Sequence, residues 1–85
     1  MRVIETLREL FCRKFGCDPE DVEMPATLDR LNIAPHERDE MALILSETYG
    51  VDMTGQDAAA CETVEDVVAF VEDRLIEREE QSHAN

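Results

Sequence analysis

Few side chains in this 85-residue sequence are spaced in a way that would support catalysis or metal binding. His36 and Glu40 lie four positions apart, as two metal ligands on one helix would, but the sequence offers no second pair of ligands. A surface contact between them is therefore the simpler interpretation. Neither Ser46 nor Ser82 lies in a nucleophile-elbow motif, and the sequence has no glycine-rich phosphate loop. We expect no enzymatic activity, no catalytic residue and no bound metal.

The three cysteines, Cys12, Cys17 and Cys61, have spacings that fit neither a zinc site nor a redox pair. Cys12 and Cys61 flank apolar positions, which favours buried or half-buried thiols. The alternative is an activated thiol at Cys12, beside the positive charges of Arg8 and Arg13. An odd number of cysteines favours a reduced, cytoplasmic setting.

The charge of the chain restricts its partners. The formal net charge is −13, and most of it falls after residue 36: residues 37–57 carry 6 acids and 1 base, and residues 58–85 carry 8 acids and 2 bases. Such a field repels the phosphates of nucleic acids and anionic membrane surfaces. We therefore expect neither as a partner, and expect instead the basic surface of another protein.

The hydrophobic pattern predicts an all-α fold, a small bundle of three main helices and one short helix with a long first loop. The first helix covers residues 2–15 and the central helix starts near Pro35, a suitable first helical residue. A short third helix covers residues 55–61, and Thr63 begins the last helix as part of a capping box with Asp66. Five apolar residues should hold the 17–34 connection against the core: Val22, Met24, Leu28, Leu31 and Ile33.

One domain, residues 1–77, accounts for this pattern, and residues 78–85 should form a flexible C-terminal tail. The N-terminal segment MRVIETLREL is too charged for a signal peptide. No apolar run approaches the roughly 20 residues that span a bilayer. We expect a cytoplasmic monomer.

The central helix has two different faces. Its core side carries Met41, Ala42, Ile44, Leu45 and Tyr49, and Gly50 should end it in a left-handed conformation. The opposite side is acidic and holds one large apolar residue, Leu43. It could be a docking patch, in which an apolar anchor lies inside a charged ring, or an ordinary solvated face with one exposed leucine.

The chain as a whole resembles the acyl carrier protein family. The similarity covers about residues 3–76 and rests on four segments in order: FGCDPEDV, ATLDRLNI, EMALILSETYGVDM and ETVEDVVAFVEDRL. The resemblance implies a bundle of three main helices plus one short helix. It also implies a carrier whose 4′-phosphopantetheine is attached to the serine of an Asp-Ser-Leu motif at the start of the second helix.

At that motif the sequence departs from the family, because the matching positions are Ala34, Pro35 and His36. The attachment is a phosphodiester to a hydroxyl, which proline lacks, and residues 28–40 contain no serine or threonine. We therefore expect no cofactor.

The family's second helix is the acidic surface that basic partner enzymes recognise. Glu37, Glu40 and Glu47 match its acidic positions, and Leu43 lies where an apolar contact is expected. The predicted partner-binding set is His36, Glu37, Asp39, Glu40, Leu43 and Glu47.

Three hypotheses follow. The first is an unmodified acyl-carrier-like module that binds an acyl-transfer or synthase enzyme of a fatty-acid or secondary-metabolite type pathway. The second is a working carrier with an atypical attachment, for which Cys17 and Ser46 offer the only conceivable atoms. The third is a structural or regulatory helical bundle that shares only the architecture.

Overall fold

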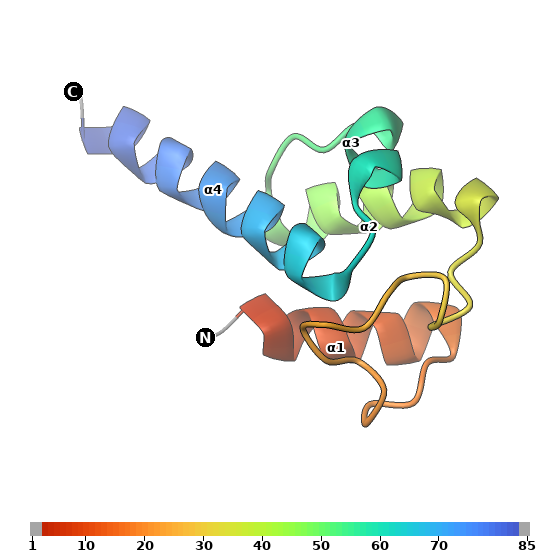
Figure 1. Ribbon diagram of the computed structural model, residues 1–85. Helices are drawn as coiled ribbons and strands as arrows, with labels where there is room; N and C mark the ends of the chain where they lie inside the picture. The colour runs from red at the N-terminus through yellow and green to blue at the C-terminus, as the bar shows by residue number, and fades with distance from the viewer. Residues whose placement is uncertain (1–2, 84–85) are drawn as a thin grey trace.

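The computed structural model describes residues 3–83, with side chains through residue 77, and this part of the chain is helical without a β-strand. Figure 1 shows α1 (Val3–Phe15), α2 (Arg38–Tyr49), α3 (Gly55–Ala60) and α4 (Val64–His83), and a 3₁₀ turn, Pro35–Glu37, leads into α2. The predicted all-α bundle of three main helices and one short helix is confirmed.

Helix α1 forms because Leu7 and Phe11, one turn apart, both enter the core. It ends at Gly16, whose φ of +70° is accessible to glycine at low cost. The N–H of Cys17 then donates to the carbonyl of Phe11 at 3.3 Å, a capping bond that uses an otherwise free helix-end carbonyl.

The long first loop, residues 16–34, is held by both side chains and backbone. Val22, Leu28, Leu31 and Ile33 are buried, as predicted. The prediction for Met24 was wrong: its side chain is 39% exposed, and its carbonyl instead accepts a hydrogen bond from the N–H of Glu65 at 2.9 Å. Spacing in an irregular loop does not fix the direction of a side chain, so this anchor is made by the backbone.

Two capping boxes define the helices of the second half. Thr63 and Asp66 bond reciprocally at the start of α4, the hydroxyl accepting from the Asp66 N–H and the carboxylate accepting from the Thr63 N–H, both at 3.2 Å. Thr54 and Asp57 form the same arrangement at α3, which was not predicted. These caps satisfy N–H groups that a helix start leaves unpaired, and they explain why even the short helix α3 is regular.

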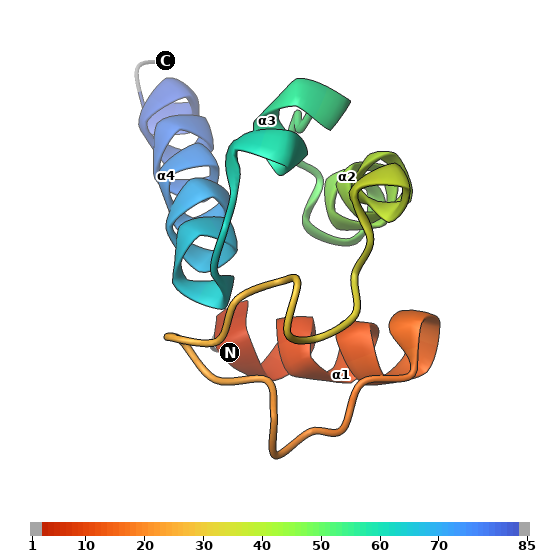
Figure 2. The same cartoon turned by 45° about the vertical axis from the view of Figure 1, so that its right-hand side comes forward.

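The helices surround one core. Helix α1 lies below the others with the first loop across it, and α2, α3 and α4 lie together on the far side (Figures 1 and 2). The α4 side chains Val64, Val67, Val68 and Val71 are all buried. Helix α4 continues to His83 and projects beyond the bundle in Figure 1. The boundary expected at residue 77 stays a prediction.

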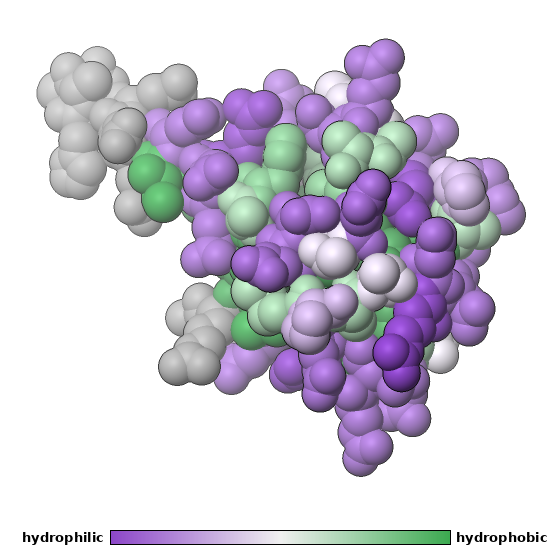
Figure 3. Space-filling view, in the orientation of Figure 1, coloured by the Kyte–Doolittle hydropathy of each residue, from purple (hydrophilic) through white to green (hydrophobic). Residues whose placement is uncertain are grey.

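Hydrophilic side chains cover most of the face shown in Figure 3, with smaller hydrophobic areas between them. Of the described helices, none is long and apolar enough to cross a membrane.

Candidate functional site at the start of helix α2

Pro35 occupies the first position of the turn that leads into α2. Ala34 before it is extended, with φ −64° and ψ 156°, as a residue preceding proline should be. The Glu37 carboxylate accepts a hydrogen bond from the Ala34 N–H at 3.2 Å, and the Glu37 N–H donates to the Ala34 carbonyl at 2.8 Å. The helix start is therefore held by Glu37 and by the fixed φ of proline, without a side-chain cap at position 34.

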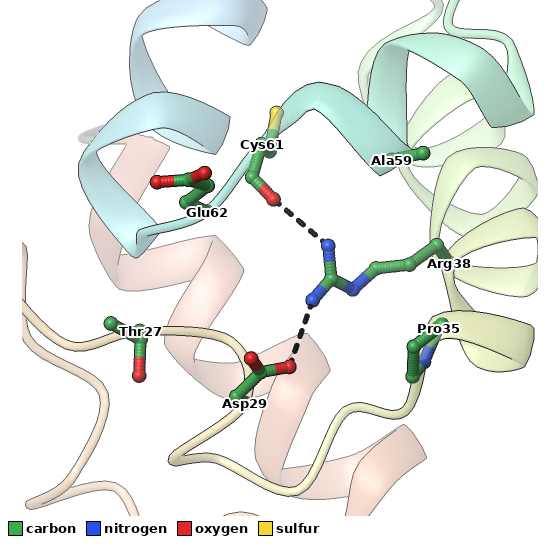
Figure 4. A pocket seen from close by; sticks show the side chains of 7 residues that line it. All are labelled: Thr27, Asp29, Pro35, Arg38, Ala59, Cys61 and Glu62. Carbon is green, nitrogen blue, oxygen red and sulfur yellow. Dashed lines mark hydrogen bonds and ion pairs between the residues drawn. The ribbon is translucent and has the colours of Figure 1, made fainter.

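A pocket of about 490 Å³ lies beside this turn (Figure 4). It is bordered by the first loop, the start of α2 and the connection between α3 and α4. Its lining residues are Thr27, Asp29, Pro35, Arg38, Ala59, Cys61 and Glu62.

Arg38 reaches across this pocket and is the one buried charged residue in the described part of the chain, with 9% of its surface exposed. Its Nη1 donates to the Cys61 carbonyl at 2.8 Å, and its Nη2 lies 3.4 Å from the Asp29 carboxylate. Its Nε is buried and has no hydrogen-bond partner. One side chain thus ties α2 to the first loop and to the α3–α4 connection.

Arg38 was not predicted as a site residue, although the sequence holds a signal for it. Arg38 precedes Met41, Ala42 and Leu45 at helical spacing, and all three are buried. A charged residue in line with a buried stripe is expected to be either strained or specifically bonded.

The predicted partner-binding residues lie at the start of α2 and along its outer side. His36, Asp39, Glu40, Leu43 and Glu47 are exposed, and the Leu43 side chain is 59% exposed.

Two members of the set also have intramolecular roles. Glu37 is half-buried and caps the helix start. Asp39 lies against α3, because a Cβ added to Gly55 would overlap its carboxylate. The side chains that point freely outward are therefore those of His36, Glu40, Leu43 and Glu47.

The two atoms considered for an atypical attachment already have partners within the protein. The Ser46 hydroxyl accepts a hydrogen bond from the Met53 N–H at 3.1 Å and donates to the Met53 carbonyl at 3.2 Å, which fixes the chain between α2 and α3. The Cys17 thiol lies 3.6 Å from the Leu31 carbonyl, and burial raises the pKa of this thiol. A raised pKa lowers the fraction of nucleophilic thiolate.

The remaining thiols fit the expectation of buried or half-buried cysteines. Cys61 is buried, burial raises the pKa of its thiol, and Cys12 is half-buried. The two arginines near Cys12 have other partners: Arg8 donates to the Val22 carbonyl at 3.2 Å, and Arg13 pairs with a glutamate of α1. Among the described residues no cluster of three or more acidic, histidine or cysteine side chains could hold a metal ion.

Comparisons with known proteins agree with the fold and with the predicted resemblance. No family model matches the chain. The acyl carrier protein of Solidesulfovibrio magneticus is 27% identical over 73 residues, which is 85% of this chain and 94% of that protein. The crystal structure of the acyl carrier protein of Thermotoga maritima superimposes with a TM-score of 0.77 at 19% identity, covering 88% of each chain. The sequence similarity and the shared fold both support the resemblance of this chain to acyl carrier proteins.

Proposed function

We propose that this protein is an acyl-carrier-like interaction module that carries no 4′-phosphopantetheine and binds a basic surface of a partner protein through α2. The observation that carries the proposal is Pro35, at the position that the resemblance assigns to the family's modified serine. The turn that begins α2 is intact, so the substitution removes the nucleophilic hydroxyl and keeps the helix that a partner would contact.

The environment of the other candidate atoms supports the absence of the cofactor. Ser46 is occupied by two hydrogen bonds to Met53 in the α2–α3 connection. Modification there would remove the hydroxyl hydrogen and with it the bond donated to the Met53 carbonyl. Cys17 has a thiol with a raised pKa, which disfavours attack by its sulfur at neutral pH.

The exposed side of α2 supports docking. Glu40 and Glu47 lie about two helical turns apart on either side of Leu43, so a basic partner would meet two carboxylates and one apolar contact on the same surface. Charged groups at such a surface accelerate association, and the apolar contact slows dissociation.

The class of partner follows from the relatives. The chain is similar to acyl carrier proteins, and we therefore propose an acyl-transfer or synthase enzyme of a fatty-acid or secondary-metabolite type pathway as the partner. We further propose that the module acts as a monomer in the cytoplasm.

The cofactor half of the proposal is tested by mass spectrometry. The protein is incubated with a phosphopantetheinyl transferase and coenzyme A, beside an acyl carrier protein that retains its serine as the positive control. The mass of this chain should stay unchanged while the control gains the prosthetic group. A pantetheine-sized mass gain on this chain would instead support the carrier with an atypical attachment.

The proposed docking through α2 is tested by comparing charge reversals on α2 with charge reversals on α4. The partner is isolated by affinity capture from the source cell, and its association with purified variants is then measured by surface plasmon resonance. Glu40→Lys with Glu47→Lys should slow association by about tenfold or more at low salt, with a smaller effect at high salt.

Glu65→Lys with Glu72→Lys is the matched control, because both residues are exposed on α4 and the net charge changes equally. This control should leave the association rate near that of the wild type. Equal slowing by both pairs would mean that only the overall charge matters. Unchanged binding of the α2 variant would favour the structural or regulatory bundle.

A further inference from the structure

The pocket beside Pro35 contains a buried charge with incomplete bonding. Nine-tenths of the Arg38 surface is removed from solvent, yet its Nε has no hydrogen-bond partner. Native proteins rarely leave a buried donor of a charged group unpaired, and such a donor is often completed by a molecule from outside the chain. The missing partner must be an acceptor, because a guanidinium only donates.

The geometry indicates where this acceptor would bind. Nη1 is occupied by the short bond to the Cys61 carbonyl, whereas Nη2 has only the 3.4 Å contact with Asp29. Nε and Nη2 form one edge of the guanidinium, and this edge faces the space between Asp29 and Pro35 (Figure 4). Nε itself is covered in this structure, so a carboxylate can accept two parallel hydrogen bonds from this edge, the geometry that arginine binds best, only when the Asp29 side chain moves aside.

Asp29 occupies this edge only in part. Its side chain is 83% exposed and makes one long contact, so it can turn toward solvent at little cost. A ligand carboxylate would therefore replace Asp29 on the guanidinium.

Charge and lining restrict the ligand further. Asp29 and Glu62 both line the pocket, in a chain of net charge −13, so a singly charged head group is favoured over a phosphate dianion. Pro35 and Ala59 offer apolar atoms to the rest of the ligand, and a pocket of about 490 Å³ has room for a short chain. We propose that this pocket binds a small monocarboxylate with a short apolar tail, its head group held by Arg38.

The test is a titration of ¹⁵N-labelled protein with butyrate, followed by NMR chemical shifts, with 1-butanol and inorganic phosphate as separate arms at matched ionic strength. Butyrate should cause saturable shifts at residues of the pocket, butanol should not saturate, and phosphate should bind more weakly than butyrate. Tighter binding of phosphate, or equal binding of butanol, would overturn the assignment of a carboxylate.

Two variants probe the role of the guanidinium. Arg38→Lys keeps the charge and loses the fork, and it should weaken butyrate binding by about tenfold. Asp29→Asn removes the competing carboxylate at a side chain that is 83% exposed, and it should tighten binding by up to about fivefold, the range of an exposed ion pair.

Asp52→Asn is the matched control for net charge, because Asp52 is exposed and outside the pocket lining. It should leave the affinity unchanged. The proposal is wrong if butyrate gives no saturable shifts at the pocket, or if Asp52→Asn tightens binding as much as Asp29→Asn does. The Asp29 result does not depend on the stability of the Arg38 variant, so it decides the question even where that variant fails to fold.

Discussion

Comparing Arg38→Met with Asp29→Asn separates the two bonds that the Arg38 side chain makes. Methionine approximates the length of the arginine stem and removes the guanidinium. The change breaks the 2.8 Å hydrogen bond to the buried Cys61 carbonyl and the 3.4 Å contact with Asp29. It also removes the buried, unpartnered Nε. The first effect destabilises the fold, and the last stabilises it.

The magnitudes decide the sign. A hydrogen bond from a charged donor contributes about 1.5–3 kcal/mol, and a buried carbonyl left without a donor costs about 1–3 kcal/mol. Removing the buried, unpaired Nε stabilises the variant by about 1–3 kcal/mol, which offsets part of that loss. We expect Arg38→Met to lower the free energy of unfolding by about 1–2 kcal/mol. Asp29→Asn should cost less than about 0.5 kcal/mol, because that carboxylate is 83% exposed.

Urea unfolding followed by far-ultraviolet circular dichroism measures both variants. A chain of this length has a stability on the order of 4–13 kcal/mol, so a loss of this size is easily resolved. In a thermal melt it corresponds to about 4–8 °C per kcal/mol. If Asp29→Asn is as costly as Arg38→Met, the ion pair rather than the Cys61 bond stabilises the fold. If Arg38→Met is neutral or stabilising, the guanidinium does not hold the three segments together.

Three further predictions concern single groups. Burial raises the pKa of Tyr49 to about 12 from 10.0. The stabilising contribution of this phenol is therefore complete below pH 10 and is lost as the pH rises toward 12. Tyr49→Phe should remove this part of the pH dependence of stability, measured by urea unfolding. The backbone N–H groups of Glu62 and Thr63 lower the pKa of Asp66 from 3.8. The contribution of the Asp66 carboxylate to stability is therefore lost as the pH falls below that value. Asp66→Asn should reduce the loss of stability at acid pH, and an unchanged loss would contradict the capping role. Gly16→Ala should cost about 1 kcal/mol from the φ of +70° alone, because no atom lies within 4 Å of the added Cβ; a urea melt without a shift would refute this.

Much of the fold could be predicted from local sequence. The hydrophobic pattern predicted the first and last helices, and the structure buries Leu7 and Phe11 of α1 and four valines of α4. Proline at position 35 and glycine at position 50 marked the limits of the central helical segment, and Gly50 adopts the left-handed conformation expected of a helix end. These signals succeed because helix periodicity and terminal backbone conformations depend on residues only a few positions apart.

The first loop was less predictable. Its buried residues were identified except for Met24, whose side chain is exposed although its carbonyl is bonded to the start of α4. The N–H of Leu28 similarly donates to the Glu62 carbonyl at 2.9 Å, a contact between residues far apart in the sequence. Backbone pairing of this kind leaves no pattern in the side chains of the loop.

The candidate site likewise has features that the sequence predicts and features that only the tertiary structure shows. By itself, the sequence determined that position 35 has no hydroxyl, that the outer side of α2 is acidic around Leu43, and that the helical segment leading into α2 begins at Pro35. Only the tertiary structure decided that Arg38 is buried, that Cys61 and Asp29 are its partners, and that a pocket opens between them. The physical reason is range: a missing atom and a helix face are properties of neighbouring residues, whereas a buried charge and its pocket exist only where the first loop, α2 and the α3–α4 connection converge.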